Sequence, residues 1–237
     1  MENTEFGYLG EDISVTEVRV RMAARALGCN NLGHAYGHVS ARLDSDTFLV
    51  CAPKPMGLIT AEDEGTVVPI EGPLPDGVLG EVRCHQQIYK RRNDVNGIAR
   101  TFLRNVMTLS TFQRTPRPRI GFASYFAPAP PLWDDPLLLR DDESAKKLAH
   151  TLGDARAIVM RGNGCILTGA TVEEAIVMAF YLEEAATTEL AVMASGQEDR
   201  SLVYSDEQAK SRAVSSGQIF ERMWDFLTHG DPEGNKR

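Results

Sequence analysis

Glu81 and His85 are two residues that can carry protons, and they stand four positions apart. Apolar residues between about Gly80 and Arg92 recur at helical spacing, so both side chains are expected on one helix face, where they could interact. Glu81 could then act as a general acid or base, with His85 orienting it or the substrate. The alternative is an ordinary buried pair that steadies the helix.

Two more histidines, His34 and His38, lie in the glycine-flanked stretch GHAYGHVSARL, which is expected to form a loop. Glycines allow the backbone to approach a ligand closely, so either histidine could enter a site. For His34 a hydrogen bond that stabilises the loop is favoured, whereas His38 is a candidate to point into the site.

Arginines form the third candidate group. Arg100, Arg104 and Arg161 could bind a carboxylate together, because a guanidinium recognises carboxylates through two parallel hydrogen bonds. The alternative is surface or interface ion pairs. Arg100 is the strongest candidate because it lies inside an apolar strand-like segment, whereas Arg161 could simply hold a turn.

Alternating strands and helices must position these residues. Strands are expected in TFLVCA, TVVPI, GIARTFL, AIVMRG and CILTG. Helices are expected after the capping boxes Ser14–Glu17 and Thr171–Glu174, the latter ending at Gly196, and also in residues 80–92, 104–112 and 141–153. The turn at Gly162–Gly164 suggests an antiparallel hairpin, so the pattern predicts an α/β fold with a mixed sheet covered by helices on both faces.

The remaining segments are less regular. Residues 115–136 are rich in proline and aromatics, which excludes a regular element and suggests an active-site or interface role. Tyr125, Phe126 and Trp133 could line the substrate entrance, or pack in the core or an interface. Two helices are expected in a C-terminal extension of about residues 204–229, and the tail GDPEGNKR is expected to fray.

Composition limits the possible functions. The chain has 237 residues and is 43% hydrophobic, which suits one domain over residues 1–237. Its net charge of -8 disfavours nucleic-acid or anionic-membrane partners. No apolar run approaches the ~20 residues of a membrane helix. The acidic start MENTEFGYLGED does not fit a secretory signal peptide. Four scattered cysteines are expected to be reduced and mostly buried, in a cytoplasmic protein.

Four blocks in order resemble the class II aldolase/adducin family, over about residues 14–196: GHAYGHVSARL, FLV followed by GLITAED, GEVRCHQQIYKRRNDVNGIARTF, and RGNGCILTGATVEEAIVMAFYLEEAA. The GHVSAR form is similar to the subgroup of pyridine-dicarboxylate decarboxylases rather than to the sugar-phosphate aldolases. The resemblance implies a sheet-centred α/β fold, usually a homotetramer with active sites between subunits.

The resemblance also implies a divalent metal held by one glutamate and three histidines. It places Glu81 at the glutamate, but Arg100 and Phe102 at an H-x-H pair and Asn163 at the third histidine. Arginine is cationic, phenylalanine has no donor atom and asparagine is a weak one, so no metal or other cofactor is expected there. Instead Arg100 could occupy the metal's volume and pair with Glu81.

The sugar-phosphate loops of the aldolases are also altered. Tyr36 and His38 lie in the first loop, Lys54 lies between two prolines in the second, and Gly80 precedes Glu81 in the third. Few of the small hydroxylated residues that bind phosphate remain, so the substrate is not expected to be a phosphosugar.

Three functions follow as alternatives. The first, which we favour, is a metal-independent lyase for a small, anionic, carboxylated or ketonic metabolite, by decarboxylation, C–C cleavage or a related cyclisation or isomerisation in biosynthesis. Its catalytic residues would be Glu81, His38 and Arg100, with substrate-binding residues His85, Phe102, Asn163, Tyr36 and Arg104. The second is a non-catalytic oligomeric scaffold or binding protein. The third is a metalloenzyme with a relocated site at Glu81, His85 and His38.

Overall fold

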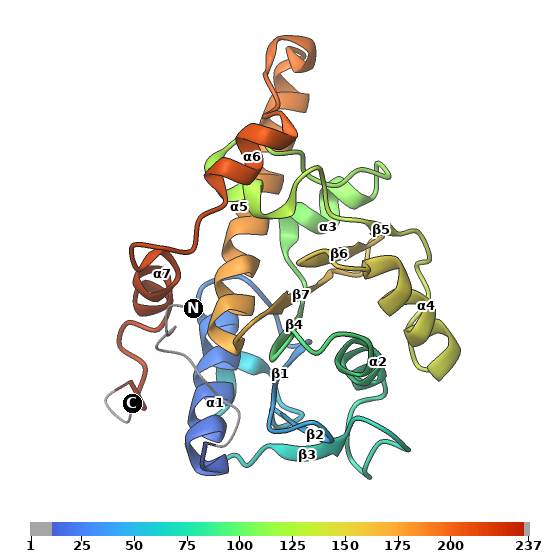
Figure 1. The fold of residues 1–237 in the computed structure, drawn as a ribbon, viewed down its shortest axis with the longest axis vertical. Helices are drawn as coiled ribbons and strands as arrows, with labels where there is room; N and C mark the ends of the chain where they lie inside the picture. The colour runs from blue at the N-terminus through green and yellow to red at the C-terminus, as the bar shows by residue number, and fades with distance from the viewer. Residues whose placement is uncertain (1–10, 235–237) are drawn as a thin grey trace.

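The computed structural model describes residues 11–234, which form a seven-stranded mixed sheet with helices on both faces (Figure 1). The strands are β1 (His38–Arg42), β2 (Thr47–Val50), β3 (Thr66–Pro69), β4 (Gly97–Thr101), β5 (Leu132–Trp133), β6 (Ala157–Met160) and β7 (Cys165–Gly169). They lie in the order β3-β2-β1-β4-β7-β6-β5, and only β5 and β6 pair in parallel. The predicted α/β fold and the predicted hairpin of β6 and β7 are confirmed.

The helices are α1 (Ile13–Cys29), α2 (Arg83–Arg91), α3 (Arg104–Ser110), α4 (Asp142–Leu152), α5 (Val172–Ser195), α6 (Asp206–Arg212) and α7 (Ile219–Leu227), with short 3-10 helices at Met56–Leu58, Gly80–Val82, Gly121–Phe126 and Glu198–Arg200. In Figure 1, α1, α5 and α7 lie on one side of the sheet, and α2 and α4 lie on the other. No helix in residues 11–234 is both long and apolar enough to cross a membrane.

Strand alternation divides the core into two layers. On β4, Ala99 belongs to the hydrophobic cluster shared with α1 and α5, whereas Ile98 belongs to the cluster shared with α2 and α4. On β7, Leu167 and Ile166 divide in the same way. Successive residues of a strand point to opposite faces of the sheet. Val39, Ala41 and Ala99 belong to the cluster with α1 and α5, so the even-numbered residues of β1 and β4, including His38 and Arg100, point to the face that α2 covers.

The start of α1 differs from the prediction, and so does part of the predicted cap of α5. α1 begins at Ile13 because the Asp12 side chain accepts a hydrogen bond from the Ser14 amide at 2.9 Å, so the predicted capping box at Ser14–Glu17 is wrong. One of the two contacts of the predicted capping box of α5 is present, since Thr171 Oγ1 accepts from the Glu174 amide at 3.1 Å. The other differs, because the Glu174 carboxylate accepts from the Ala170 amide instead of the Thr171 amide. Residues 1–10, where most of the N-terminal segment judged for a signal peptide lies, are outside the described residues.

The proline-rich segment 115–136 is more regular than predicted. Leu132 and Trp133 form the edge strand β5, which pairs with β6: the Val159 amide donates to the Pro131 carbonyl at 3.0 Å and the Arg161 amide donates to the Trp133 carbonyl at 3.0 Å. Tyr125 and Phe126 are buried in the core, where the Tyr125 ring stacks on the Tyr181 ring, and Trp133 packs against the second cluster. Core packing, one of the two readings of these aromatics, is therefore the one that the structure bears out.

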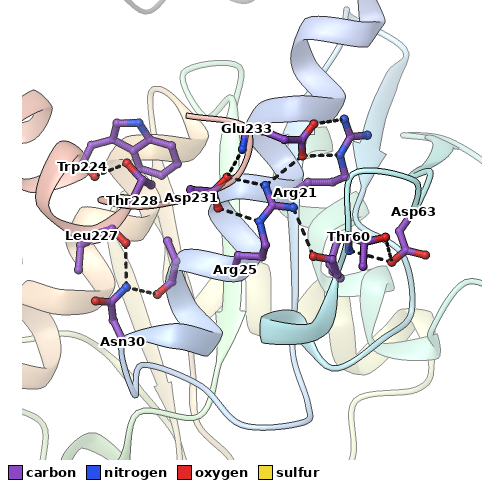
Figure 2. Close-up of polar contacts among 12 residues, drawn as sticks. Arg21, Arg25, Asn30, Thr60, Asp63, Trp224, Leu227, Thr228, Asp231 and Glu233 are labelled. Atoms are coloured by element: carbon purple, nitrogen blue, oxygen red, sulfur yellow. Dashed lines mark hydrogen bonds and ion pairs between the residues drawn. The ribbon is translucent and has the colours of Figure 1, made fainter. Parts of the chain in front are cut away.

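The C-terminal tail is held by ion pairs, and the prediction that it frays is wrong for residues 230–234. Arg21 and Arg25 on α1 bind Glu233 at 2.8 Å and 3.0 Å, and Arg25 also binds Asp231 at 2.7 Å (Figure 2). Glu233 is 1% exposed, so these contacts are shielded from solvent. The ion pairs of Asp231 and Glu233 with α1 therefore hold in place a segment whose turn-forming composition predicts fraying. Residues 235–237 lie outside the described residues.

The four cysteines are free thiols, as predicted. Cys51, Cys84 and Cys165 are buried, and Cys29 is exposed at the end of α1. Burial raises the pKa of Cys51 to about 11 and that of Cys84 and Cys165 to about 12, so these three thiols are protonated and poorly nucleophilic at neutral pH.

Candidate functional site

A cavity of about 580 Å³ lies at the end of the sheet where β1 begins, β4 ends and the turn between β6 and β7 lies. These three positions meet because β4 is antiparallel to both β1 and β7. Six residues proposed from the sequence line the cavity, namely Tyr36, His38, Glu81, Arg100, Phe102 and Asn163. The topology thus brings together residues that are up to 127 positions apart in the chain, from Tyr36 to Asn163.

Two of the proposed residues do not line it. His85 is completely buried behind His38. Arg104 is exposed at the start of α3 and is absent from the cavity wall, so the proposed cluster of three arginines is wrong. Arg161 forms an ion pair with Asp134 outside the cavity, as expected for a residue that holds a turn.

Arg100 is a buried cation whose partners are neutral. Its Nη2 donates to Asn163 Oδ1 at 3.2 Å, its Nη1 donates to the Thr101 carbonyl at 3.4 Å, and its guanidinium lies 4.3 Å from the centre of the Phe102 ring. Within residues 11–234 no carboxylate lies within ion-pair distance of it, so the predicted pair with Glu81 is wrong. Burial lowers the pKa of Arg100, but a guanidinium remains charged at neutral pH.

The β6–β7 turn brings Asn163 to Arg100. A Cβ atom at Gly164 would lie 2.2 Å from the Thr101 carbonyl oxygen and 2.9 Å from Arg100 Nη1. Gly164 also has a φ of +79°, which side chains other than glycine rarely adopt. The turn can therefore approach the end of β4 this closely only with glycine at that position.

Glu81 lies in the 3-10 helix Gly80–Val82 rather than on α2, so it does not share a helix face with His85 and their predicted interaction is wrong. Its carboxylate instead accepts a hydrogen bond from Arg140 Nε at 3.2 Å. Arg140 is a largely exposed side chain on the cavity wall. Glu81 therefore lies at the cavity with a solvent-accessible partner that a bound anion could compete for.

His38 is the first residue of β1, not a loop residue as predicted, and it stands opposite Arg100 in the register of β1 and β4. Its Nδ1 lies 2.9 Å from His85 Nε2, and His85 Nδ1 lies 2.6 Å from Ser40 Oγ. Ser40 Oγ in turn lies 2.9 Å from Tyr89 Oη. A continuous chain of polar contacts therefore runs from the cavity wall into the core.

Both imidazoles of this chain are neutral at pH 7. Burial lowers the pKa of His38 well below its usual range, and the interactions with His85 and with the Arg100 cation lower it further. Burial also lowers the pKa of His85 to about 3, with Arg100 contributing. Since His38 Nδ1 is engaged by His85, its Nε2 is the nitrogen left for a molecule in the cavity.

Four residues of the site were not identified from the sequence. Ser40 and Tyr89 had a readable signal, because Ser40 is two residues after His38 on a strand and Tyr89 is four residues after His85 on a helix. Lys54 and Arg140 also line the cavity. Arg140 follows the proline-rich segment, where no periodicity indicates which way a side chain points.

The metal implied by the resemblance does not fit this set of side chains. At the corresponding positions the donors are one carboxylate, Glu81, and one amide, Asn163, and the Arg100 cation lines the same cavity and binds Asn163. Within residues 11–234 no three or more histidine, cysteine, aspartate or glutamate side chains are grouped to hold a metal. A relocated site is not supported either, because both ring nitrogens of His85 already have partners and Glu81 binds Arg140.

Comparison with known proteins places these features in context. The family model described as the class II aldolase and adducin N-terminal domain matches residues 19–190. The 3,4-dihydroxyphthalate decarboxylase of Arthrobacter keyseri is 26% identical over 205 residues, covering 77% of this chain and 83% of the relative. The enzyme of the same name from Terrabacter sp. (strain DBF63) is 27% identical, covering 80% of this chain and 84% of the relative.

Solved structures share the fold. An aldolase II superfamily protein from Pseudomonas syringae superposes with a TM-score of 0.76 at 24% identity, over 90% of each chain. The L-fuculose 1-phosphate aldolase from Glaciozyma antarctica PI12 also has a TM-score of 0.76, at 18% identity, over 95% of this chain and 94% of that one. At these identities the superpositions establish the architecture alone.

Proposed function

Because this chain belongs to the class II aldolase and adducin family, we propose that it is a carbon–carbon lyase that decarboxylates a small metabolite bearing a hydroxyl or keto group near its carboxylate. The names of the curated relatives support decarboxylation as the reaction. The loss of the phosphate-binding loop residues argues against a phosphosugar substrate. C–C cleavage of the aldolase type would use the same oxyanion chemistry and is the nearest variant of the proposal.

One observation carries the proposal, namely the buried Arg100 guanidinium, which faces a cavity of about 580 Å³ without a carboxylate partner in residues 11–234. A buried charge left uncompensated is costly, and an anionic substrate would supply the compensation. Arg100 donates two hydrogen bonds to neutral acceptors, which leaves further guanidinium N–H donors for a ligand oxygen. The apolar part of the wall, including Phe102 and Leu138, suits a flat carbon skeleton.

The reaction can be written with the groups present. His38 Nε2 takes the proton of a substrate hydroxyl and returns it to the carbon that bears the carboxylate. The bond from that carbon to the carboxylate then breaks, CO₂ leaves, and the electron pair moves through the conjugated system to the hydroxyl oxygen. Arg100 stabilises the negative charge on that oxygen, which finally takes a proton from solvent. The net reaction consumes one proton and releases one CO₂.

In this scheme Arg100 does the electrostatic work that a divalent metal would otherwise do, and no step requires a metal. Glu81 and Arg140 at the cavity wall are proposed to bind the outer part of the substrate, with Arg140 able to exchange the Glu81 carboxylate for a substrate carboxylate. A dianionic substrate would then be held at both ends of the cavity.

The test is a thermal-shift screen with small mono- and dicarboxylates, including 3,4-dihydroxyphthalate, followed by measurement of CO₂ release after chelator treatment. The variants are Arg100→Met and, as a matched control, Arg161→Met, which removes an arginine paired with Asp134 outside the cavity. We expect a carboxylate-dependent shift and CO₂ release in the parent and in Arg161→Met, and neither in Arg100→Met. Arg100→Lys keeps the charge without the bidentate geometry and should weaken binding or turnover.

A parent protein that shows no carboxylate-dependent shift, or shifts that are equal in Arg100→Met, would refute the anionic-substrate proposal. The non-catalytic scaffold, which the replaced histidines of the family favour, would then be the better function. Turnover that appears only after a metal is added would refute the metal-independent mechanism while leaving the lyase assignment in place.

A further inference from the structure

We propose that Tyr89, Ser40 and His85 form a one-directional hydrogen-bond chain that fixes the tautomer of His38, so that His38 Nε2 meets the cavity as a proton acceptor. His38 is then the general base, and the other three are positioning residues. The proposal rests on the proposed function only for the reaction that His38 serves. The arrangement of protons is a property of the protein alone and can be measured without a substrate.

The chain follows from two regular spacings. His38 and Ser40 are two residues apart on β1 and face α2, while His85 and Tyr89 are four residues apart on α2 and face the sheet. The four side chains are between 0% and 3% exposed, so solvent does not compete for their contacts. Every polar contact among them therefore needs a proton from within the group.

The number of available protons fixes the direction of the hydrogen-bond chain. Four contacts must be satisfied: His38 to His85, His85 to Ser40, Ser40 to Tyr89, and Tyr89 to the Ser40 carbonyl at 3.1 Å. Two neutral imidazoles and two hydroxyls supply four protons. The Tyr89 proton goes to the Ser40 carbonyl, since a carbonyl can only accept. Ser40 must then donate to Tyr89 Oη and accept from His85 Nδ1–H.

The hydrogen-bond chain continues from Ser40 through His85 and His38 to the cavity. With its proton on Nδ1, neutral His85 has a lone pair on Nε2, which accepts from His38 Nδ1–H at 2.9 Å. His38 Nε2 is then unprotonated. In the reverse tautomers Ser40 would donate to His85 Nδ1. Tyr89 would then have to donate its single proton both to Ser40 Oγ and to the Ser40 carbonyl, so one of these two contacts would lack a proton of its own. One tautomer pair satisfies all four contacts fully.

The surroundings keep the group neutral and oriented. The Phe48 ring on β2 packs 4.9 Å from the Tyr89 ring and 6.4 Å from the His85 ring, measured between ring centres. Two cations border the chain, Arg100 beside His38 and the Arg42 guanidinium 4.7 Å above the Tyr89 ring. Burial lowers the pKa of each histidine, and the Arg100 cation lowers both further, which disfavours a positive charge on the imidazoles.

A base held in this way serves the proposed reaction. A neutral Nε2 lone pair can take a hydroxyl proton, and the imidazolium that forms beside Arg100 is destabilised, so it returns the proton readily to carbon. The wrong tautomer would present an N–H to the cavity and could not begin the transfer. Positioning residues of this kind act on the rate of turnover more than on substrate affinity.

The first measurement is ¹⁵N NMR of histidine-labelled protein at pH 7, with His38 and His85 assigned through His38→Gln and His85→Gln. We expect both imidazoles to be neutral and protonated on Nδ1. In Tyr89→Phe the Ser40 proton loses its acceptor and turns to His85 Nδ1, so both histidines should switch to the Nε2–H tautomer. Tyr125→Phe is the matched control, because it removes a partly buried tyrosine hydroxyl that lies outside the chain and donates to the Val214 carbonyl at 2.6 Å.

An Nε2–H proton on His38 in the parent, or the same tautomers in the parent and Tyr89→Phe, would overturn the chain. Ser40→Ala should give a mixture of tautomers and Ser40→Thr should restore the parent state, so the result does not depend on one variant folding. With an active substrate, Tyr89→Phe should lower kcat by about 100-fold or more with KM changed less than about twofold. Unchanged kcat would refute the positioning role, whereas correct tautomers without any turnover would refute only the proposed function.

Discussion

At the scale of single residues, the Arg100 cation and the neutral imidazoles of His38 and His85 constrain one another. The register of β1 and β4 places His38 opposite Arg100, and His85 lies directly behind His38. A second positive charge beside a buried guanidinium is strongly disfavoured, so the histidines stay neutral in the folded protein. In the unfolded chain they regain an ordinary pKa, and folding stability must therefore depend on pH.

The sign of that dependence is fixed by the lowered pKa values. Between the ordinary value of 6.5 and the folded value of about 3 for His85, the unfolded chain binds more protons than the folded one. Stability is therefore full above about pH 6.5 and is lost as the pH falls, by about 1.4 kcal/mol per pH unit for each histidine. Urea denaturation between pH 7 and pH 4.5 measures the slope, which should be about halved in His85→Gln.

Carboxylates also change the stability with pH, but they can be distinguished from the histidines. Some act in a lower pH range, and the others contribute equally to the parent and to His85→Gln. The Arg21 and Arg25 contacts lower the pKa of Glu233 to about 2, so its contribution is lost only below about pH 4.5. Burial raises the pKa of Glu183, which works in the opposite direction and is the same in parent and variant. Equal slopes in the parent and His85→Gln would show that His85 is not a buried neutral imidazole.

The Arg100 cation also leads to a prediction about the metal content of the purified protein. Its guanidinium lies on the same wall as the two remaining donors, Glu81 and Asn163, and would repel a divalent ion between them. We expect elemental analysis to find no stoichiometric zinc, manganese, iron or cobalt, and chelators to leave the melting temperature unchanged. About one metal per chain would contradict this.

The sequence identified His38, His85, Glu81 and Arg100 as candidates but not Ser40 and Tyr89, and it predicted the contacts of these residues less well than their identity. Strand and helix spacing place His38, Ser40, His85 and Tyr89 on facing surfaces, and this much can be derived from alternation and an i+4 step. The partner of Glu81 could not be derived in this way. Glu81 precedes α2 and meets Arg140, which is 59 residues further along the chain, and the path of the intervening segment depends on tertiary packing.

At the scale of elements, the sequence predicted strands and helices where one face is buried, and erred where capping or tertiary contacts decide. The helix at α5 and its stop at Gly196 follow from local signals, because Thr171 and Gly196 satisfy the helix ends themselves. The start of β1 could not be predicted from local signals, because the glycines before it suggested a loop through His38. The tail up to Glu233 was also misjudged, since its order comes from arginines on α1.

The β6–β7 turn offers a test of how elements hold the site. Gly164→Ala would place a methyl group against the Thr101 carbonyl in a backbone conformation that alanine disfavours, and should destabilise the fold by at least about 2 kcal/mol. Gly162→Ala in the same turn has a φ of +65° and open space around the Cβ, so only the conformational cost of about 1 kcal/mol applies. Denaturant melts compare the two, and equal losses would show that the close approach to β4 does not matter.

At the scale of the whole molecule, apolar side chains at the cavity remain uncovered. Tyr36 is 70% exposed and Leu138 is 51% exposed on the cavity wall, and the neighbouring Leu137 is 71% exposed. Apolar side chains gathered at one opening are typical of a surface that another chain covers. A second copy placed there would bury them and also close the cavity to water, which would strengthen the electrostatic action of Arg100.

We therefore expect a homo-oligomer, most simply a tetramer with closed symmetry, in agreement with the assembly that the family resemblance implies. Light scattering after size-exclusion chromatography should give about four times the 26.1 kDa of one chain. Leu137→Asp places a charge among the apolar side chains without lining the cavity, so it should yield smaller species that remain folded by circular dichroism. Leu202→Asp, at an 84% exposed leucine outside the cavity wall, is the matched control and should leave the mass unchanged. A parent protein that is monomeric at micromolar concentration would contradict the assembly, and the cavity would then have to bind its substrate open to solvent.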